Sequence, residues 1–274
     1  MADDVKSLPR PNWRDPSSYS YTGNLTREGW SWEFLRRNPK YRAAWFDRPK
    51  PVAVGFTHRR QAHAAASAAV SAEAAAWGLV SFADPDLSAF DADVFWRAET
   101  NPAVLAVDAC PGSHGAKDAF DVRGLAHPAI VLGLGDGVEH VLLGDGIHRI
   151  QLEVRHRSLL EGPLRLRYDI AGFAGVEAKL MTLQRLMTLR RLGRFPRSLF
   201  PPQRRAHRWI MALRAFDGSR AGVNPREIAA ALFGNNAVRN DWAGESDYLR
   251  SRVRRAIAVG EGLANGGYLR LMSQ

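Results

Sequence analysis

The chain has 274 residues, 46% hydrophobic and 24% charged, which is enough for two domains with a sizeable core. Its net charge of +10 is uneven: residues 151–274 hold 22 Lys and Arg against 10 Asp and Glu, whereas residues 1–150 hold 16 against 18. A single cysteine, Cys110, excludes an intramolecular disulfide, and no apolar run approaches the roughly 20 residues of a membrane span. We therefore expect a cytoplasmic protein with no membrane partner, whose basic half attracts polyanions.

Residues 8–48 predict a small aromatic-rich N-terminal module. The run GWSWEFLRRN is typical of a short helix that stops before Pro39. So short a module cannot bury this much aromatic surface alone. The rings can form a small aromatic core or an interdomain docking face for the basic half or for another protein, and the two are compatible. The second is our expectation for Trp13, Tyr19, Trp30, Trp32, Phe34, Tyr41 and Trp45.

The middle of the chain changes from a linker to strands. Residues 49–76 are Ala-rich and predict a linker. Residues 77–169 contain short β-prone runs such as AVLAVDA, AIVLGL, EHVLLG and LRLRYDI, separated by turn residues. They predict a central antiparallel β-meander that packs on helices. Residues 170–274 predict a helical domain, so the expected fold class is α+β.

Residues 205–263 predict a helix-turn-helix with an extended turn. The first helix, about 205–216, ends at Asp217-Gly218, because glycine adopts the conformation of a helix end. Asn224-Pro225 caps and begins the second helix, which Gly234 ends. A turn at Asn235–Asp241 then precedes a third helix that reaches Leu263 and buries Tyr248, Leu249 and Val253. This turn is longer than the usual three or four residues.

The third helix carries the arginines that point to nucleic acid. A guanidinium pairs bidentately with phosphate and with guanine edges, so we expect this helix to enter the major groove of double-stranded DNA. Arginines near the start of the second helix would contact the DNA backbone. The alternative is that these arginines are only a solvated helix face. The predicted DNA-binding residues are Arg220, Arg226, Arg250, Arg252, Arg254 and Arg255.

Motifs for other chemistry are weak. The glycines of Gly133–Gly137 do not open a helix, as a phosphate-binding loop must. The acidic run FADPDLSAFDAD lacks the spacing of a calcium loop. Cys110 has no indicated general base or oxyanion donor. We therefore expect no metal, no cofactor and no enzyme.

The segment RPNWRDPSSYSYTGNLTREGWSWEFLRRNPKYRAAWF resembles the aromatic N-terminal module of regulators carried by proteobacterial integrative and conjugative elements. The segments LRAFDGSRAGVNPREIAAALFG and DWAGESDYLRSRVRRAIAVGEGL resemble their C-terminal extended-turn helix-turn-helix domain. FseA-type transcriptional activators and QseM-type antiactivators share this domain. Because this chain is basic and has the module, it resembles the activators.

This resemblance implies a nucleoid-associated transcriptional activator of excision and transfer genes, and hence a role in horizontal gene transfer. The implied partners are a promoter site, an acidic antiactivator of the same domain family and RNA polymerase. The alternative function is a protein–protein regulator that uses its basic face and aromatic module without specific DNA readout.

Overall fold

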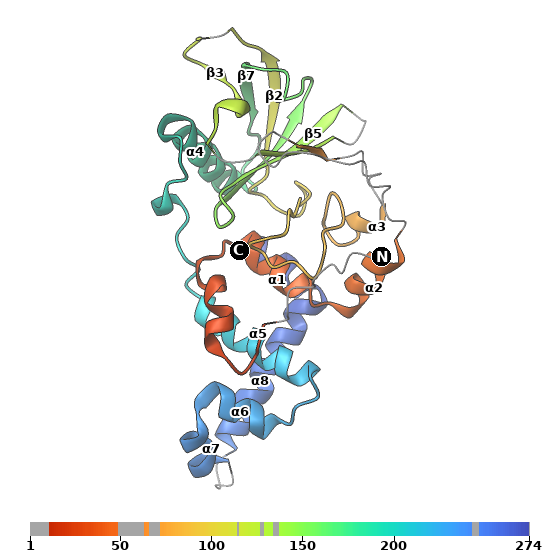
Figure 1. Ribbon diagram of the computed structural model, residues 1–274, viewed down its shortest axis with the longest axis vertical. Coiled ribbons are helices and arrows are strands. Elements are labelled where there is room, and N and C mark those ends of the chain that lie inside the picture. The colour runs from red at the N-terminus through yellow and green to blue at the C-terminus, as the bar shows by residue number, and fades with distance from the viewer. Residues whose placement is uncertain are drawn as a thin grey trace, which may run out of the picture. The chain divides into compact units, whose positions relative to one another are not determined.

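The computed structural model describes residues 11–48, 63–65, 72–113, 115–126, 129–133, 137–242 and 247–273 (Figure 1). The chain divides into two compact units. Unit 1 takes in Met1–Arg42, Asp84–Phe90 and Pro202–Leu271, and unit 2 takes in Ala43–Ala83, Asp91–Pro201 and Met272–Gln274. Helices and a mixed sheet make up the fold, so the predicted α+β class is confirmed.

Unit 2 is built on a seven-stranded sheet with the order β1-β4-β5-β6-β2-β7-β3. Strands β4, β5 and β6 form an antiparallel meander, as predicted. However, β2 pairs with β6 in parallel and β1 pairs with β4 in parallel, so the sheet as a whole is mixed. The strands are β1 His63–Ala65, β2 Leu105–Pro111, β3 Ala119–Phe120, β4 Ala129–Gly133, β5 Val138–Gly144, β6 Arg149–Arg155 and β7 Leu164–Asp169.

Helix α4, Val176–Leu192, covers one face of this sheet (Figure 1). Its Leu186 and Leu189 are buried in a core that includes Val107 and Leu152 of the sheet. The Thr182 hydroxyl donates to Ala103 O at 2.7 Å and ties the helix to the segment before β2. Unit 2 also contains α3 Ala72–Ala75 and the single turns η2 Val122–Gly124 and η3 Arg197–Leu199. Most of the predicted linker at 49–76 lies outside the described residues.

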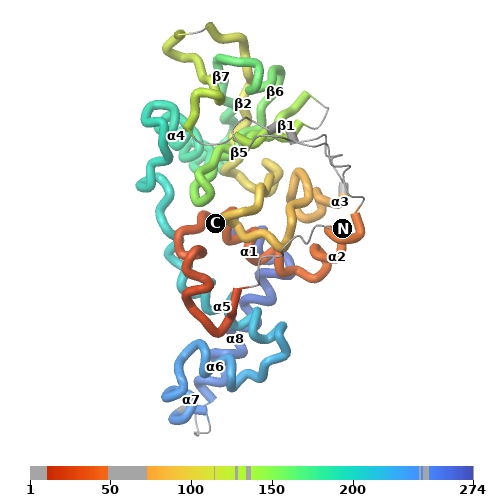
Figure 2. Tube along the Cα trace, viewed as in Figure 1, coloured from red at the N-terminus to blue at the C-terminus, as the bar shows by residue number. Residues whose placement is uncertain are grey.

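Unit 1 is helical and combines the two ends of the sequence. Figure 2 shows the N-terminal segments beside α5 and α8, and hydrogen bonds between Tyr19 and Asp217 and between Ser31 and Tyr268 join them. Its elements are η1 Pro16–Asn24, α1 Arg27–Leu35, the first turn of α2 Pro39–Asp47, α5 Ala206–Arg220, α6 Pro225–Phe233, α7 Asn235–Asp241, α8 Tyr248–Gly262, η4 Leu263–Gly267 and α9 Leu269–Met272, which ends one residue beyond the unit.

The predicted end of the first helix at Asp217-Gly218 is wrong, because α5 continues to Arg220. Gly218 serves packing instead: a Cβ at this position would lie 3.0 Å from Trp13 Cε3 and 3.2 Å from Ile228 Cγ1. The left-handed glycine comes later, at Gly222, whose φ is 73°.

The second helix begins as predicted, since the Asn224 side chain accepts from Glu227 N at 3.0 Å and Pro225 is the first helical residue. The predicted turn at Asn235–Asp241 is wrong, because these residues form helix α7. The third helix, α8, begins at Tyr248 rather than near Asp241. Tyr248 is also 60% exposed, contrary to its predicted burial, whereas Leu249 and Val253 are buried as expected.

Candidate nucleic-acid interface

The aromatic module packs directly on α5, the first helix of the predicted helix-turn-helix. The Trp13 ring lies against Gly218, and Arg214 Nε donates to Trp13 O at 3.0 Å. The Tyr19 hydroxyl donates to Asp217 Oδ2 at 2.6 Å. Trp30 packs edge-on against Trp209, with ring centroids 5.3 Å apart. Module and helix therefore share one core within unit 1.

The other aromatic residues of the predicted docking face lie in both units of the chain. Phe34 stacks on Trp30 at 6.2 Å between ring centroids. Trp32 donates its indole N–H to Leu87 O at 3.1 Å and meets the edge of Tyr41 at 5.7 Å. These rings lie in unit 1, whereas Trp45 belongs to unit 2, where the Arg48 guanidinium lies over its ring.

A buried ionic network fastens α1 to α5. Both Arg36 Nε and Arg37 Nη1 donate to Glu33 Oε2, at 2.8 and 2.7 Å, and Arg37 Nε donates to Asp217 Oδ1 at 2.8 Å. Ala89 N donates to the second Glu33 oxygen at 2.7 Å. Burial alone would raise the pKa of Glu33, but the charges of Arg36 and Arg37 outweigh it and lower that pKa to about 2. The cost of burying the negative charge of Glu33 is therefore offset by the two arginines and by the hydrogen bond from Ala89 N.

Helix α8 crosses α5 at very close range. A Cβ on Gly260 would lie 2.5 Å from Ala212 O and 2.6 Å from Phe216 Cβ, so only glycine allows this approach. Leu249 and Val253 continue the buried side of α8. The crossing fixes the helix against α5, and Arg250, Arg254 and Arg255 lie outside this contact.

One flank of α8, which we call the acid-paired flank, consists of Asp247, Arg250 and Arg254. Arg250 Nε donates to Asp247 Oδ1 at 2.5 Å, and Arg254 Nη2 donates to Asp247 Oδ2. The hydrogen bond from Arg250 and the charge of Arg254 lower the pKa of Asp247. All three side chains are at least 42% exposed. One carboxylate thus holds two solvent-facing arginines side by side.

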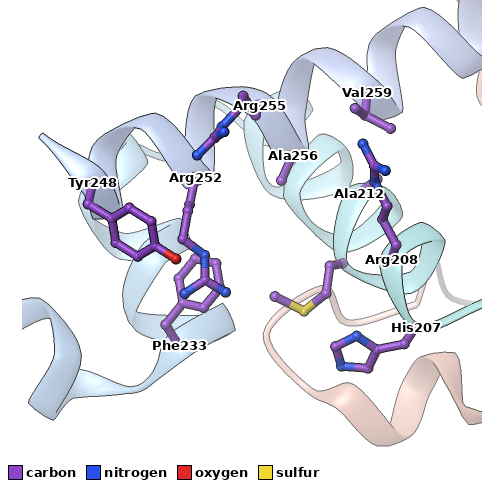
Figure 3. A pocket seen from close by; sticks show the side chains of 10 residues that line it. His207, Arg208, Ala212, Phe233, Tyr248, Arg252, Arg255, Ala256 and Val259 are labelled. Carbon is purple, nitrogen blue, oxygen red and sulfur yellow. The ribbon is translucent and has the colours of Figure 1, made fainter. Parts of the chain in front are cut away.

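The opposite flank of α8 borders a groove of about 370 Å³ against α5 and the end of α6, which we call the α5–α8 groove. The Arg252 guanidinium lies 4.2 Å from the Phe233 ring centroid and 5.5 Å from that of Tyr248. Figure 3 shows Arg252 reaching toward Phe233 beside Tyr248, with His207 and Arg208 on the α5 side. The lining residues are His207, Arg208, Met211, Ala212, Phe233, Tyr248, Arg252, Arg255, Ala256 and Val259.

The two other predicted DNA-binding arginines differ in their surroundings. Arg220 Nη1 donates to Arg37 O at 2.6 Å and its guanidinium lies 5.8 Å from the Phe216 ring centroid, so it contacts the N-terminal module. Arg226 is exposed in the first turn of α6, beside the Asn224 cap. Of these two arginines, only Arg226 lies at a helix N-terminus.

Sequence reasoning missed the α5–α8 groove and the role of Asp247. The groove brings together residues from three helices, and no local sequence pattern predicts it. Asp247 could have been found, because it lies three and seven residues before Arg250 and Arg254, on the same helical side.

Other kinds of site have no support within the described ranges. No group of three or more potential metal ligands occurs among the residues that the structure describes. Within the same ranges, no helix is long and apolar enough to cross a membrane.

Two protein-family models match the chain. Residues 170–273 match the model RovC_DNA-bd, described as a T6SS transcription factor DNA-binding domain. Residues 12–82 match a proteobacterial transcriptional regulator-like domain. No curated protein matches the chain. Both families are regulatory rather than enzymatic, and together they support a DNA-binding transcriptional regulator.

Proposed function

We propose that this protein is a sequence-specific transcriptional activator that inserts α8 into the major groove of promoter DNA. The observation that carries the proposal is the position of Arg250, Arg254 and Arg255 on the sides of α8 that do not pack on α5, inside a segment that matches a DNA-binding domain. Exposed arginines one turn apart on a fixed helix suit the spacing of base edges in the major groove.

The arginines divide into base-reading and backbone-binding groups. Arg250, Arg254 and Arg255 reach base edges and adjacent phosphates. Arg226 binds a phosphate at the start of α6, where the helix dipole favours an anion. Arg220 and Arg252 keep their contacts with Arg37 O and Phe233 and do not read bases.

Asp247 makes this readout selective. In the free protein it neutralises part of the charge of Arg250 and Arg254. Non-specific DNA offers only phosphates in exchange for this ion pair, whereas the correct site offers guanine edges to the arginines as well. Asp247 thereby weakens binding to non-specific DNA more than binding to the site.

The resemblance to FseA-type activators supports a narrower role: control of excision and transfer genes of an integrative and conjugative element. That role places the protein at the nucleoid in the cytoplasm, with RNA polymerase and an acidic antiactivator as further partners.

The alternative is a regulator that acts only through protein contacts and offers its aromatic module to a partner. Burial argues against it, because Trp30, Trp32, Phe34 and Tyr41 are at most 1% exposed. Rings that already pack against α5 in the core of unit 1 are not available to a partner protein.

The proposal is tested by selection of bound fragments from sheared genomic DNA at about 150 mM salt, where non-specific binding is weak. Wild type should enrich discrete promoter fragments, and R250A/R254A should lose them. The matched control is R165A/R167A, which removes two exposed arginines from β7 and should bind as wild type does. Enrichment that survives in R250A/R254A would mean that other residues read the site, and the absence of any enrichment by wild type would favour the protein–protein alternative.

A further inference from the structure

We infer that the α5–α8 groove is a binding site for a small organic anion with a flat apolar body, such as an aromatic carboxylate. This site lies on the flank of α8 opposite Arg250 and Arg254, and Arg255 is the one arginine that it shares with the proposed DNA contacts.

The shape of the groove follows from the helix crossing. The contact between Gly260 and Ala212 brings α5 and α8 together at one point, and the small side chains of Ala212 and Ala256 leave space beside it. Met211, Phe233 and Val259 supply apolar walls. A volume of about 370 Å³ falls in the range of small-molecule sites.

The charge of the groove selects an anion. Arg208, Arg252 and Arg255 line it, and none of the described residues that line it is acidic. None of these three arginines pairs with a carboxylate within the described part of the chain, in contrast to Arg250 and Arg254. A guanidinium is a planar donor that binds a carboxylate in bidentate fashion. The groove thus offers a partner to a carboxylate.

The rings of Phe233 and Tyr248 favour a ligand with a flat, apolar part. Arg252 lies near the rings of both Phe233 and Tyr248, so its guanidinium is held where it can meet a carboxylate at the groove wall (Figure 3). A flat ring can then pack on Phe233 and on the small residues Ala212 and Ala256. A simple inorganic anion would leave these apolar walls in water, which favours an amphipathic ligand.

Other occupants fit less well. DNA phosphates would pair with the arginines but would not cover Met211, Phe233 and Val259. A partner helix is about 10 Å wide and needs a strip of anchoring side chains over two turns. Two turns of such a helix would occupy more space than this groove provides. The combination of three arginines, two aromatic rings and a limited space therefore commits the groove to a small ligand.

The test is calorimetric titration of the full chain, without DNA, with 1-naphthoate, indole-3-acetate and 8-anilinonaphthalene-1-sulfonate. At least one anion should bind with a 1:1 stoichiometry, and neutral 1-naphthalenemethanol should bind at least about tenfold more weakly, since it lacks the charge-assisted hydrogen bonds. R252A should lower the affinity of the anion about tenfold. A256W, which fills the groove, should abolish binding.

The control is R250A, which removes an arginine from the other flank of α8 and should leave the anion affinity unchanged. Circular dichroism and the melting temperature establish that each variant is folded, and R208A replaces R252A should that variant unfold. The inference is overturned if no anion binds, if the neutral analogue binds equally well, or if folded groove variants bind as wild type does. Binding of an acidic amphipathic peptide in place of all three anions would also overturn it.

Discussion

Two ionic clusters of unit 1 each join one carboxylate to two arginines, but they differ in what they contribute to the protein. Glu33 joins Arg36 and Arg37 inside the protein, where both arginines are at most 9% exposed. Asp247 joins Arg250 and Arg254 on the surface of α8, where the arginines are 42% and 65% exposed. A buried carboxylate that loses its partners is left with a large desolvation cost, whereas an exposed pair is worth little. Burial thus makes the first cluster structural and leaves the second able to exchange its partner.

The same comparison qualifies the charge of the basic half. Arg214 is 4% exposed and donates to Trp13 O, Arg14 O and Ala231 O, so its charge supports the fold rather than a ligand. Net charge alone therefore overstates the surface that is available to DNA. The exposed arginines that the two proposals use are those on α8, at the start of α6 and in the α5–α8 groove.

The largest expected effect is on stability. E33Q removes the carboxylate that Arg36 and Arg37 share in the interior, and should reduce the free energy of unfolding by about 3–5 kcal/mol. Urea denaturation at pH 7 measures it. The control is R27A on the exposed side of α1, which should change that free energy by less than about 0.5 kcal/mol. An E33Q value near that of R27A would mean that the network is not structural.

The same carboxylate predicts a pH dependence. The pKa of Glu33 is lowered to about 2 from an ordinary 4.5, so the unfolded state binds a proton first as the pH falls. Its stabilising contribution is complete above pH 4.5 and disappears as the pH falls toward 2. Unfolding free energies measured from pH 6 to pH 3 should fall more steeply for wild type than for E33Q. Parallel curves would contradict the assignment.

The next effect is on DNA binding. R254A removes one exposed arginine from the acid-paired flank and should weaken binding to the selected site by about 10- to 100-fold, the worth of one bidentate arginine–guanine pair. Fluorescence anisotropy on a labelled duplex measures it. R167A on β7, with an equal loss of charge, should change the affinity by less than about threefold.

A smaller effect concerns the helix cap. Asn224 accepts from Glu227 N at the start of α6, and N224A should reduce the free energy of unfolding by about 1 kcal/mol. N224D keeps an acceptor at this position and should recover most of the loss. Equal stabilities of N224A and N224D would show that the cap hydrogen bond contributes nothing.

The smallest effect is on selectivity. D247N removes the charge that competes for Arg250 and Arg254, and should raise the affinity for non-specific DNA several-fold more than that for the site. Competition between the labelled site and sheared heterologous DNA measures this ratio. An unchanged ratio would mean that Asp247 does not contribute to the selectivity of DNA binding.

Local chemistry explains which parts of unit 1 could be predicted. The Asn224-Pro225 start of α6 depends on neighbouring residues only, and the sequence was sufficient for it. Gly218 was mistaken for a helix end because its role depends on Trp13, far away in the chain. Helix α7 was missed because Asn235–Asp241 is polar and lacks an apolar period.

The sheet shows the same limit. The meander β4–β5–β6 joins neighbours in sequence and was predicted. The parallel pairing of β2 with β6 joins Leu105–Pro111 to Arg149–Arg155 across three intervening strands, and alternation of residues does not determine such a partner. The α5–α8 groove was unpredictable for a related reason, since its lining comes from three helices.

The most direct test of the account is methylation interference on the selected site. Methylation of guanine N7 blocks the edge that arginine reads in the major groove. The account predicts that methylation at one or two guanines prevents binding of wild type, and that R254A is insensitive at one of those guanines while it remains sensitive elsewhere. Binding of wild type that no guanine methylation disturbs would contradict the entry of α8 into the major groove.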